Sequence, residues 1–241
     1  KQRIRFLMEG CKNGAWGSEA GEDAEDAICV RVADFDWNKL SVSLTNPTVR
    51  SFPTTQIRKL TLKKGDLLIE KSGGGEKTPV WRIVAFDADQ LSVTSNFVAR
   101  IRPRADVSSR FLLYLLAAQY TSGYSRQFIK QNTGIQNLDD AAWFSNDAWL
   151  PDCKSQKTIA DFLDRETARI DQLIEKRSKF ADLILERRLA LISKAITGVS
   201  EDTRWLETVP DGWKVERAKV HFRESQRSDA PRLQAYVRYA R

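Results

Sequence analysis

A loop with three consecutive glycines follows a predicted strand, because the run EKSGGGEKTP contains Gly73, Gly74 and Gly75. Glycine-rich loops can leave backbone N–H groups free to hold phosphate oxygens, and Lys71 and Lys77 add positive charge. A Walker A loop is excluded, since the Lys77-Thr78 pair would need a glycine where Glu76 stands. The loop is therefore a candidate for contact with nucleic-acid phosphates. The alternative is a flexible hairpin connection.

A second candidate is the turn-rich run QNTGIQNLD, whose amide side chains are Gln131, Asn132, Gln136 and Asn137. Amides can pair bidentately with adenine in the major groove, so these side chains could read DNA bases. Amide-rich runs are also common as ordinary turns, and the residues alone do not decide between the two interpretations.

Catalytic and metal-binding patterns are missing from the sequence. The run that starts at Asn46-Pro47 lacks the second proline and the aromatic ring of an adenine methyltransferase loop. Asp152 and Lys154 could belong to a metal-dependent nuclease, but they stand alone beside a predicted helix, and metal chemistry needs several converging oxygen ligands. The three cysteines have no CxxC spacing, and His221 is the only histidine. We predict no catalytic residue and no metal site.

The elements that position the two loops can be predicted from periodicity. Alternating apolar and polar residues predict strands at residues 27–37, 67–70, 80–86 and 91–101. Residues 1–27 are poorly patterned, and the run CKNGAWGSEAGEDAEDA at residues 11–27 is expected to form a loop. A helix is predicted to begin after Ser108 or Ser109, and Pro151 ends the first domain.

Residues 155–196 predict one long helix, because they contain neither glycine nor proline. At 1.5 Å per residue it would be on the order of 60 Å long. Ser155 is expected at the N-cap and Gly198 at a left-handed C-cap. Apolar residues at alternating steps of three and four predict a coiled-coil seam of Ile159, Leu163, Ile170, Leu173, Phe180, Ile184 and Leu191.

Two arginines interrupt this seam. Arg177 and Arg187 could extend their stems to solvent or pair across the interface with acidic residues of another helix. A helix of this length indicates a spacer or dimerisation element that needs a partner. The alternative is a solvated helix that packs only on its own domain.

The composition limits the possible partners and compartments. The 241 residues carry a net charge of +7, which fits a polyanion such as DNA but also an anionic membrane surface or simple solubility. The chain contains no run of eighteen apolar residues and no secretory signal pattern, so we predict that it does not span a membrane. Three widely separated cysteines favour reduced thiols and a cytoplasmic location.

Several motifs resemble the specificity subunit of type I restriction-modification systems, and they occur in the same order. The most specific are GDLLIEKSGGG at residues 65–75 and QKTIADFLDRETARID at residues 156–171. Shorter matches are Ala15-Trp16-Gly17, Arg31-Val32 through Asp36-Trp37, Ser95-Asn96-Phe97, GIQNL at residues 134–138, Glu186-Arg187-Arg188 and the run from Trp205 to Trp213.

This resemblance implies an α+β fold with three parts. A mixed α/β target-recognition domain would occupy residues 1–152, a long coiled-coil spacer helix residues 153–198, and the start of a second recognition repeat residues 199–241. The chain would be a non-catalytic subunit that binds double-stranded DNA, reads one half of a bipartite target and docks methyltransferase subunits. Restriction subunits would join through the complex. S-adenosylmethionine, Mg²⁺ and ATP would belong to those partners, and this chain would bind no cofactor.

The resemblance also favours both loops as DNA contacts. The expected DNA-binding residues are Arg58, Lys59, Lys71, Ser72, Gly73, Gly74, Gly75, Lys77, Thr133, Gly134, Gln136 and Asn137. The cationic residues would contact phosphates, with Ser72, Gln136 and Asn137 nearer to base edges.

A complete specificity subunit has two recognition domains, so this chain is interpreted as a fragment or a half-subunit whose helix pairs with a second copy. One alternative is a coiled-coil adaptor or anti-restriction decoy that binds methyltransferase subunits without reading DNA. Another is a nuclease based on Asp152 and Lys154.

Overall fold

The computed structural model describes residues 1–132 and 134–197, and the predicted second repeat and Gly198 lie outside the described residues. The chain divides into two compact units, and the first, Lys1–Arg169, contains every described strand. The strands are β1 (Gln2–Arg3), β2 (Met8–Asn13), β3 (Glu25–Val30), β4 (Phe35–Asp36), β5 (Ser41–Val42), β6 (Val49–Phe52), β7 (Leu67–Glu70), β8 (Ile83–Ala85), β9 (Ser92–Thr94), β10 (Val98–Pro103), β11 (Ile129–Asn132), β12 (Ile135–Leu138) and β13 (Asp147–Ala148). The helices are η1 (Ile4–Leu7), η2 (Val32–Asp34), α1 (Thr54–Leu60), α2 (Ser109–Thr121), η3 (Tyr124–Phe128), α3 (Asp140–Phe144) and α4 (Cys153–Thr197).

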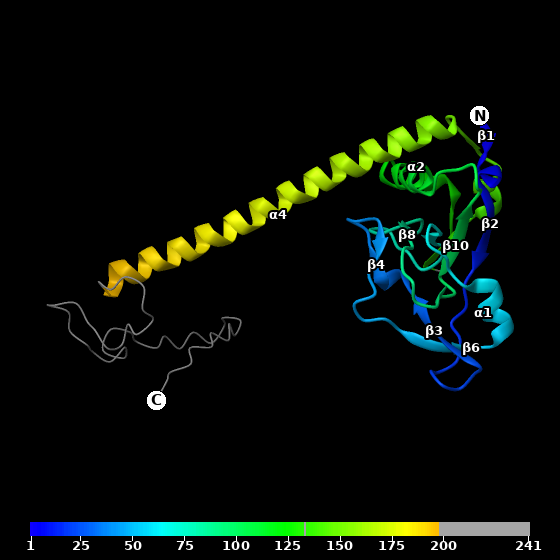
Figure 1. The fold of residues 1–241 in the computed structure, drawn as a ribbon, viewed down its shortest axis with the longest axis horizontal. Helices are drawn as coiled ribbons and strands as arrows, with labels where there is room; N and C mark the ends of the chain where they lie inside the picture. The colour runs from blue at the N-terminus through cyan, green and yellow to red at the C-terminus, as the bar shows by residue number, and fades with distance from the viewer. Residues whose placement is uncertain (133, 198–241) are drawn as a thin grey trace. The chain divides into compact units, whose positions relative to one another are not determined.

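A six-stranded sheet with the order β2-β10-β7-β8-β5-β4 forms the centre of the first unit (Figure 1). Neighbouring strands are antiparallel except β5 and β8, which are parallel. Strand β7 confirms the prediction for residues 67–70. Its Leu67 and Ile69 belong to one hydrophobic cluster and Leu68 to another, as the alternation of a strand requires. The sheet therefore has apolar clusters on both faces.

Different elements cover the two faces. On one face, Leu112 and Leu116 of α2 pack in the same cluster as Ile101 of β10. On the other, Val30 belongs to the cluster around Leu68, and its strand β3 is the centre of a second sheet with the order β6-β3-β9. The predicted cap of α2 is confirmed, because the Oγ atom of Ser108 accepts a hydrogen bond from the Phe111 N–H at 3.3 Å.

Several strand predictions need correction. Residues 11–27 are predicted to be a loop, but Cys11–Asn13 belong to β2, which pairs with β10. The sequence of β2, MEGCKN, has no β-branched or aromatic residue to indicate a strand. Residues 27–37 do not form one strand, because a 3-10 turn follows β3, and the Asp34 carboxylate accepts a hydrogen bond from the Arg31 backbone N–H at 2.8 Å. Residues 91–101 form two strands, β9 and β10, separated by a turn.

Trp81 lies in the larger cluster with a backbone conformation that is unusual for its type. Its φ angle is 105°, and the side chain is fully buried. The ring stacks on Phe128 with 5.7 Å between centroids and meets Trp143 edge to face at 4.6 Å, while its Nε1–H donates to the Leu116 carbonyl at 3.3 Å. A positive φ is strained for a bulky residue, so these contacts must hold it in place.

The cap of the long helix α4 lies three residues before the expected cap, and the helix begins at Cys153. Asp152, not Ser155, is the capping residue, because its carboxylate accepts the Ser155 N–H at 3.0 Å and the Ser155 hydroxyl at 2.8 Å. These hydrogen bonds, led by that from the Ser155 backbone, lower the pKa of Asp152 below its ordinary value. Capping of α4 therefore accounts for the position of Asp152, and no nuclease role is needed to explain it.

The first turns of α4 belong to the first compact unit. The Gln156 side chain accepts a hydrogen bond from the Ser108 N–H at 2.8 Å, and the Tyr114 hydroxyl donates to Asp164 at 2.7 Å. These contacts with α2 explain why this unit extends to Arg169, past the domain boundary expected at residue 152.

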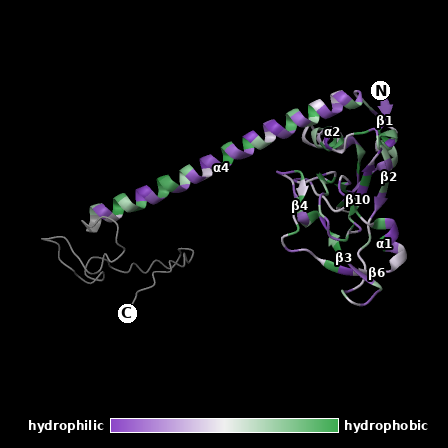
Figure 2. Cartoon of the chain, viewed as in Figure 1, coloured by the Kyte–Doolittle hydropathy of each residue, from purple (hydrophilic) through white to green (hydrophobic). Residues whose placement is uncertain are grey.

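The apolar residues of α4 that the seam predicted are mostly exposed. Figure 2 shows hydrophobic residues recurring along the whole helix. Leu163 is half-buried, and Ile159, Ile170, Leu173, Phe180, Ile184 and Leu191 are exposed together with the two arginines, Arg177 and Arg187. Exposed apolar residues outside the predicted seam are Phe162, Ile174, Leu183, Leu185, Leu189 and Ile192. The described helices include none that is both long enough and apolar enough to cross a membrane.

Candidate nucleic-acid interface

The glycine loop after β7 is held in a fixed path at its base. Gly73 has a φ of 108°, and its N–H donates to the Gln136 carbonyl at 3.0 Å. The Gly75 N–H donates to the Thr78 carbonyl at 3.0 Å, which closes a turn at the tip. The expectation of free N–H groups is therefore wrong for these two glycines, since both bond within the protein.

Gly74 is required by a close approach of two backbone segments. A Cβ atom at this position would lie 2.4 Å from the Val80 nitrogen and 2.8 Å from the Thr78 oxygen. Any side chain would therefore push apart the two arms of the loop. The triple glycine makes a tight loop possible, and the prediction of a merely flexible connection does not describe it.

The amide-rich run forms a hairpin that lies against the glycine loop. Strands β11 and β12 pair antiparallel, and Ser72 forms a bridge with Asn137. The Ser72 hydroxyl donates to the Asn137 side-chain oxygen at 2.6 Å. The Leu138 N–H donates to the Lys71 carbonyl at 2.9 Å. The structure thus brings together two runs that were selected separately in the sequence.

Gln136 supports the glycine loop from inside and does not present its amide to solvent. Its Oε1 atom accepts the Val80 N–H at 3.2 Å, and its Nε2 donates to Gln131 at 3.3 Å. The residue is buried. Its predicted position at a base edge is therefore corrected, because both ends of the amide bond within the protein. Asn137 and Gly134 are exposed, while Thr133 lies outside the described residues.

The two lysines of the loop differ in their surroundings. The Lys71 ammonium donates to Asp140 at 2.8 Å and to the Asn13 side chain at 3.0 Å, and only a fifth of its side chain is exposed. Its charge is therefore already compensated. Lys77 is exposed at the tip and forms no ion pair with any residue of the described ranges. Of the two, Lys77 is better placed for a phosphate contact.

A pocket of about 460 Å³ opens beside the glycine loop. Two large aromatic side chains at this pocket are exposed, Trp16 at 43% and Phe97 at 47%. Ser72, Gly73 and Gly74 line the same pocket, together with Arg31 and Arg82. Exposed aromatic surface beside arginines can contact bases, the thymine methyl group and phosphates.

The charges around this pocket are partly paired. Arg82 bonds the buried Glu70 carboxylate at 2.8 Å, and Arg31 bonds Asp34 at 2.9 Å. Burial raises the pKa of Glu70, although the Arg82 guanidinium opposes this shift. The Arg50 guanidinium lies 5.1 Å from the centre of the Trp16 ring. These pairs orient the side chains but leave parts of both pocket arginines exposed.

Trp16, Arg31 and Phe97 were not selected as site residues from the sequence. The signal that could have found them was the resemblance, since all three stand in its shorter motifs and the structure places them at one pocket. Arg58 and Lys59 are exposed in the last turn of α1, which does not line this pocket. The structure therefore does not bring these two residues to the glycine loop.

The described residues include no group of three or more His, Cys, Asp or Glu side chains that could hold a metal ion. Trp143 is fully buried in the main cluster. Trp149 is 74% exposed and lies 5.6 Å from the Lys1 ammonium, measured to the ring centre. The pocket beside the glycine loop offers aromatic, hydroxyl and cationic side chains that can bind a ligand.

Comparison with known proteins found similarity at the level of fold. No family model and no curated protein matches the chain. A chain from a study of complex assembly and conformational transition in the type I R-M system matches with a TM-score of 0.59 and 18% identity, over 80% of this chain and 44% of that one. The HsdS subunit from Thermoanaerobacter tengcongensis matches with a TM-score of 0.57 and 14% identity, over 88% of this chain and 51% of that one.

The chain spans about half the length of each of these two solved chains. Residues 1–169 and the long helix have the fold of a type I restriction-modification specificity subunit, as the motifs predicted. The identities are low, so the likeness describes the fold, and the pairing of α4 as a coiled coil stays a prediction.

Proposed function

We propose that this chain is a specificity subunit of a type I restriction-modification complex and recognises one half of a bipartite DNA target. The observation that carries the proposal is the fold shared with two type I chains over at least 80% of this chain. The aromatic and cationic pocket beside the glycine loop supports it, because such a surface can contact both base edges and phosphates.

The exposed apolar face of α4 supports a role in assembly. It is a candidate surface for methyltransferase subunits or for the same helix of a second copy. Pairing with a second copy would bring two recognition units together and would select a palindromic split target. Sedimentation of the purified chain tests this part, and a strict monomer at micromolar concentration would remove the second-copy arrangement.

Selection from a random duplex pool tests the recognition of DNA. The chain is combined with methyltransferase subunits of a type I system, and the bound duplexes are sequenced. An enriched split motif is the expected result. If the methyltransferase subunits are retained without any enriched motif, the chain is better interpreted as an adaptor that binds these subunits without reading DNA. The exposed helix is the observation that favours this alternative.

A pair of phenylalanine variants locates the recognition surface. Phe97→Ala removes an exposed ring from the pocket, and we expect it to relax one position of the motif at a cost of about 1–3 kcal/mol. Phe6→Ala is the matched control, because Phe6 is similarly exposed but lies outside this pocket. If both variants and the original chain enrich the same motif, the recognition surface lies outside this pocket.

A further inference from the structure

Arg100 of β10 is a buried cation without a carboxylate partner. The residue is 6% exposed, its Nε atom has no hydrogen-bond partner, and one terminal nitrogen donates to the Thr61 carbonyl at 2.7 Å. It forms no ion pair within residues 1–132 and 134–197. Burial lowers its pKa, and the charge of Arg102 lowers it further. A buried charge is costly unless it is paired, so Arg100 is suited to an anionic ligand.

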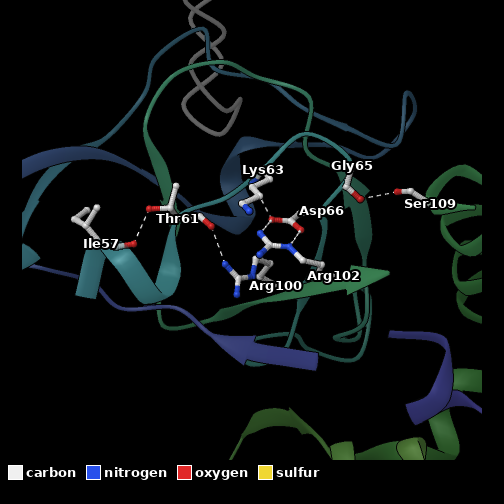
Figure 3. A network of polar contacts seen from close by, with 8 residues as sticks. All are labelled: Ile57, Thr61, Lys63, Gly65, Asp66, Arg100, Arg102 and Ser109. Carbon is white, nitrogen blue, oxygen red and sulfur yellow. Dashed lines mark hydrogen bonds and ion pairs between the residues drawn. The ribbon is translucent and has the colours of Figure 1, made fainter. Parts of the chain in front are cut away.

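A nearby carboxylate, that of Asp66, is already paired with another arginine. Asp66 receives two hydrogen bonds from Arg102, at 2.7 and 2.6 Å, and a third from the Lys63 N–H at 2.8 Å. Figure 3 shows this network, with Arg100 pointing separately to Thr61. The Asp66 carboxylate therefore cannot neutralise both arginines.

A further cation lies directly opposite Arg100 on the neighbouring strand. Lys12 of β2 is its register partner, and Gly10 is the register partner of Arg102. Alternation along both strands puts Lys12, Arg100 and Arg102 on the same face. Like charges directly opposite each other in a sheet are destabilising, which a bound anion between them would relieve.

Gly10 leaves room for such a ligand. A Cβ atom at Gly10 would have no neighbour within 4 Å, and a pocket of about 120 Å³ is lined by Glu9, Gly10, Lys12, Arg100 and Arg102. At roughly 30 Å³ per water, this volume is enough for a tetrahedral oxyanion. We propose that Lys12, Arg100 and Arg102 form a binding site for one phosphate group in the pocket that Gly10 leaves open.

The charge of this pocket sets a limit on what can bind. Glu9 brings a carboxylate to the wall, and Asp66 neutralises Arg102, so three cations and two anions leave a net charge of +1. One phosphate group fits this balance better than a polyphosphate does. Its source is either the DNA backbone, which rests on the proposed function, or a free phosphate ion or ester.

Thermal unfolding of the full chain tests the site without DNA. Sodium phosphate is compared with sodium chloride at equal ionic strength, so that general screening is the same in both series. We expect phosphate to raise the melting temperature specifically. In Lys12→Gln, the phosphate concentration for half of this effect should rise about tenfold, as expected for loss of a charged hydrogen bond.

Two further variants make the test selective. Gly10→Val leaves every charge in place but fills the pocket, and it should abolish the phosphate effect. Lys157→Gln removes another exposed lysine, on α4 and outside this pocket, and should respond like the original chain. Equal responses to phosphate and chloride, or a Lys12→Gln variant that responds normally, would overturn the site.

Binding to duplex DNA at several salt concentrations distinguishes the two sources. If Lys12→Gln weakens the phosphate effect and its salt slope for duplex binding falls by about one unit, a backbone phosphate occupies the site. If the phosphate effect is weakened and the slope is unchanged, the site is confirmed for a free phosphate group. If the phosphate effect is present but no variant or original chain binds duplex, the proposed function fails and the site stands.

Discussion

The first compact unit buries most of its large apolar side chains, whereas the large apolar side chains of α4 between Arg169 and Ile192 are exposed. Trp81 is fully buried between Phe128 and Trp143, but Phe180 on α4 is 65% exposed. A globular unit gains its stability from such internal contacts, while an exposed apolar face of this extent indicates a surface for another molecule. The first unit is therefore stabilised by contacts within the chain, whereas we expect α4 beyond Arg169 to gain such contacts from a partner.

The sharpest test of the internal contacts is Trp81→Ala. Removing this ring from the main cluster should lower the free energy of unfolding by about 3–5 kcal/mol. Denaturant titration followed by circular dichroism measures the change. Trp149→Ala is the control, because Trp149 is exposed and should change stability by less than about 0.5 kcal/mol. Similar losses in both variants would break the contrast between buried and exposed side chains.

The external contacts of α4 are tested by Phe180→Ala. If a partner helix covers this residue, the association constant should fall by at least about tenfold, because burial of a phenylalanine contributes roughly 1.5–3 kcal/mol. Sedimentation with a second copy, or with methyltransferase subunits, provides the measurement. The neighbouring Lys176→Ala should have little effect. A loss of stability in the isolated chain would mean instead that Phe180 packs within its own protein.

Within the first unit, the two loop lysines should separate stability from DNA binding. Lys77→Ala should reduce the salt slope of DNA binding by about one unit with unchanged stability. Lys71→Ala removes the partner of Asp140 and should lower the free energy of unfolding by about 1–2 kcal/mol. The salt slopes of both variants are measured on the same duplex, and their stabilities by denaturant titration. If neither variant changes the slope, the glycine loop makes no phosphate contact.

The smallest expected effect concerns the start of α4. Because the folded pKa of Asp152 is lowered, its capping contribution is present at neutral pH and is lost as the pH falls through that lowered value. Asp152→Asn keeps an acceptor but carries no charge. The variant should therefore lose less stability than the original chain between neutral pH and about pH 3. Parallel pH profiles for the two chains would rule out this role.

The sequence predicts well where one periodicity dominates. Strand β7 and the capped start of α2 follow from local patterns, and α4 follows from a long run without glycine or proline. Strand β2 could not be found in this way, because its pairing with β10 holds a segment with weak strand propensity. Serine and aspartate are both good caps, so residue type alone cannot decide between Ser155 and Asp152. Only the hydrogen bonds identify Asp152 as the cap of α4.

The candidate site was predicted in its parts but not in its arrangement. Both loops were selected from residue type, and the Ser72 bridge to Asn137 brings them together. Residue type could not show that Gln136 is buried or that Lys71 is paired with Asp140, since both depend on contacts between distant segments. The pocket residue Phe97 carried no local chemical signal of its own.

The glycine loop separates positions that tolerate substitution from positions that do not. Gly73, Gly74 and Gln136 fix its base, whereas Glu76, Lys77 and Thr78 are exposed at its tip. Mutations at the tip can therefore accumulate without unfolding the domain. A lineage that carries this loop could change the surface it presents in single steps, with each intermediate still folded.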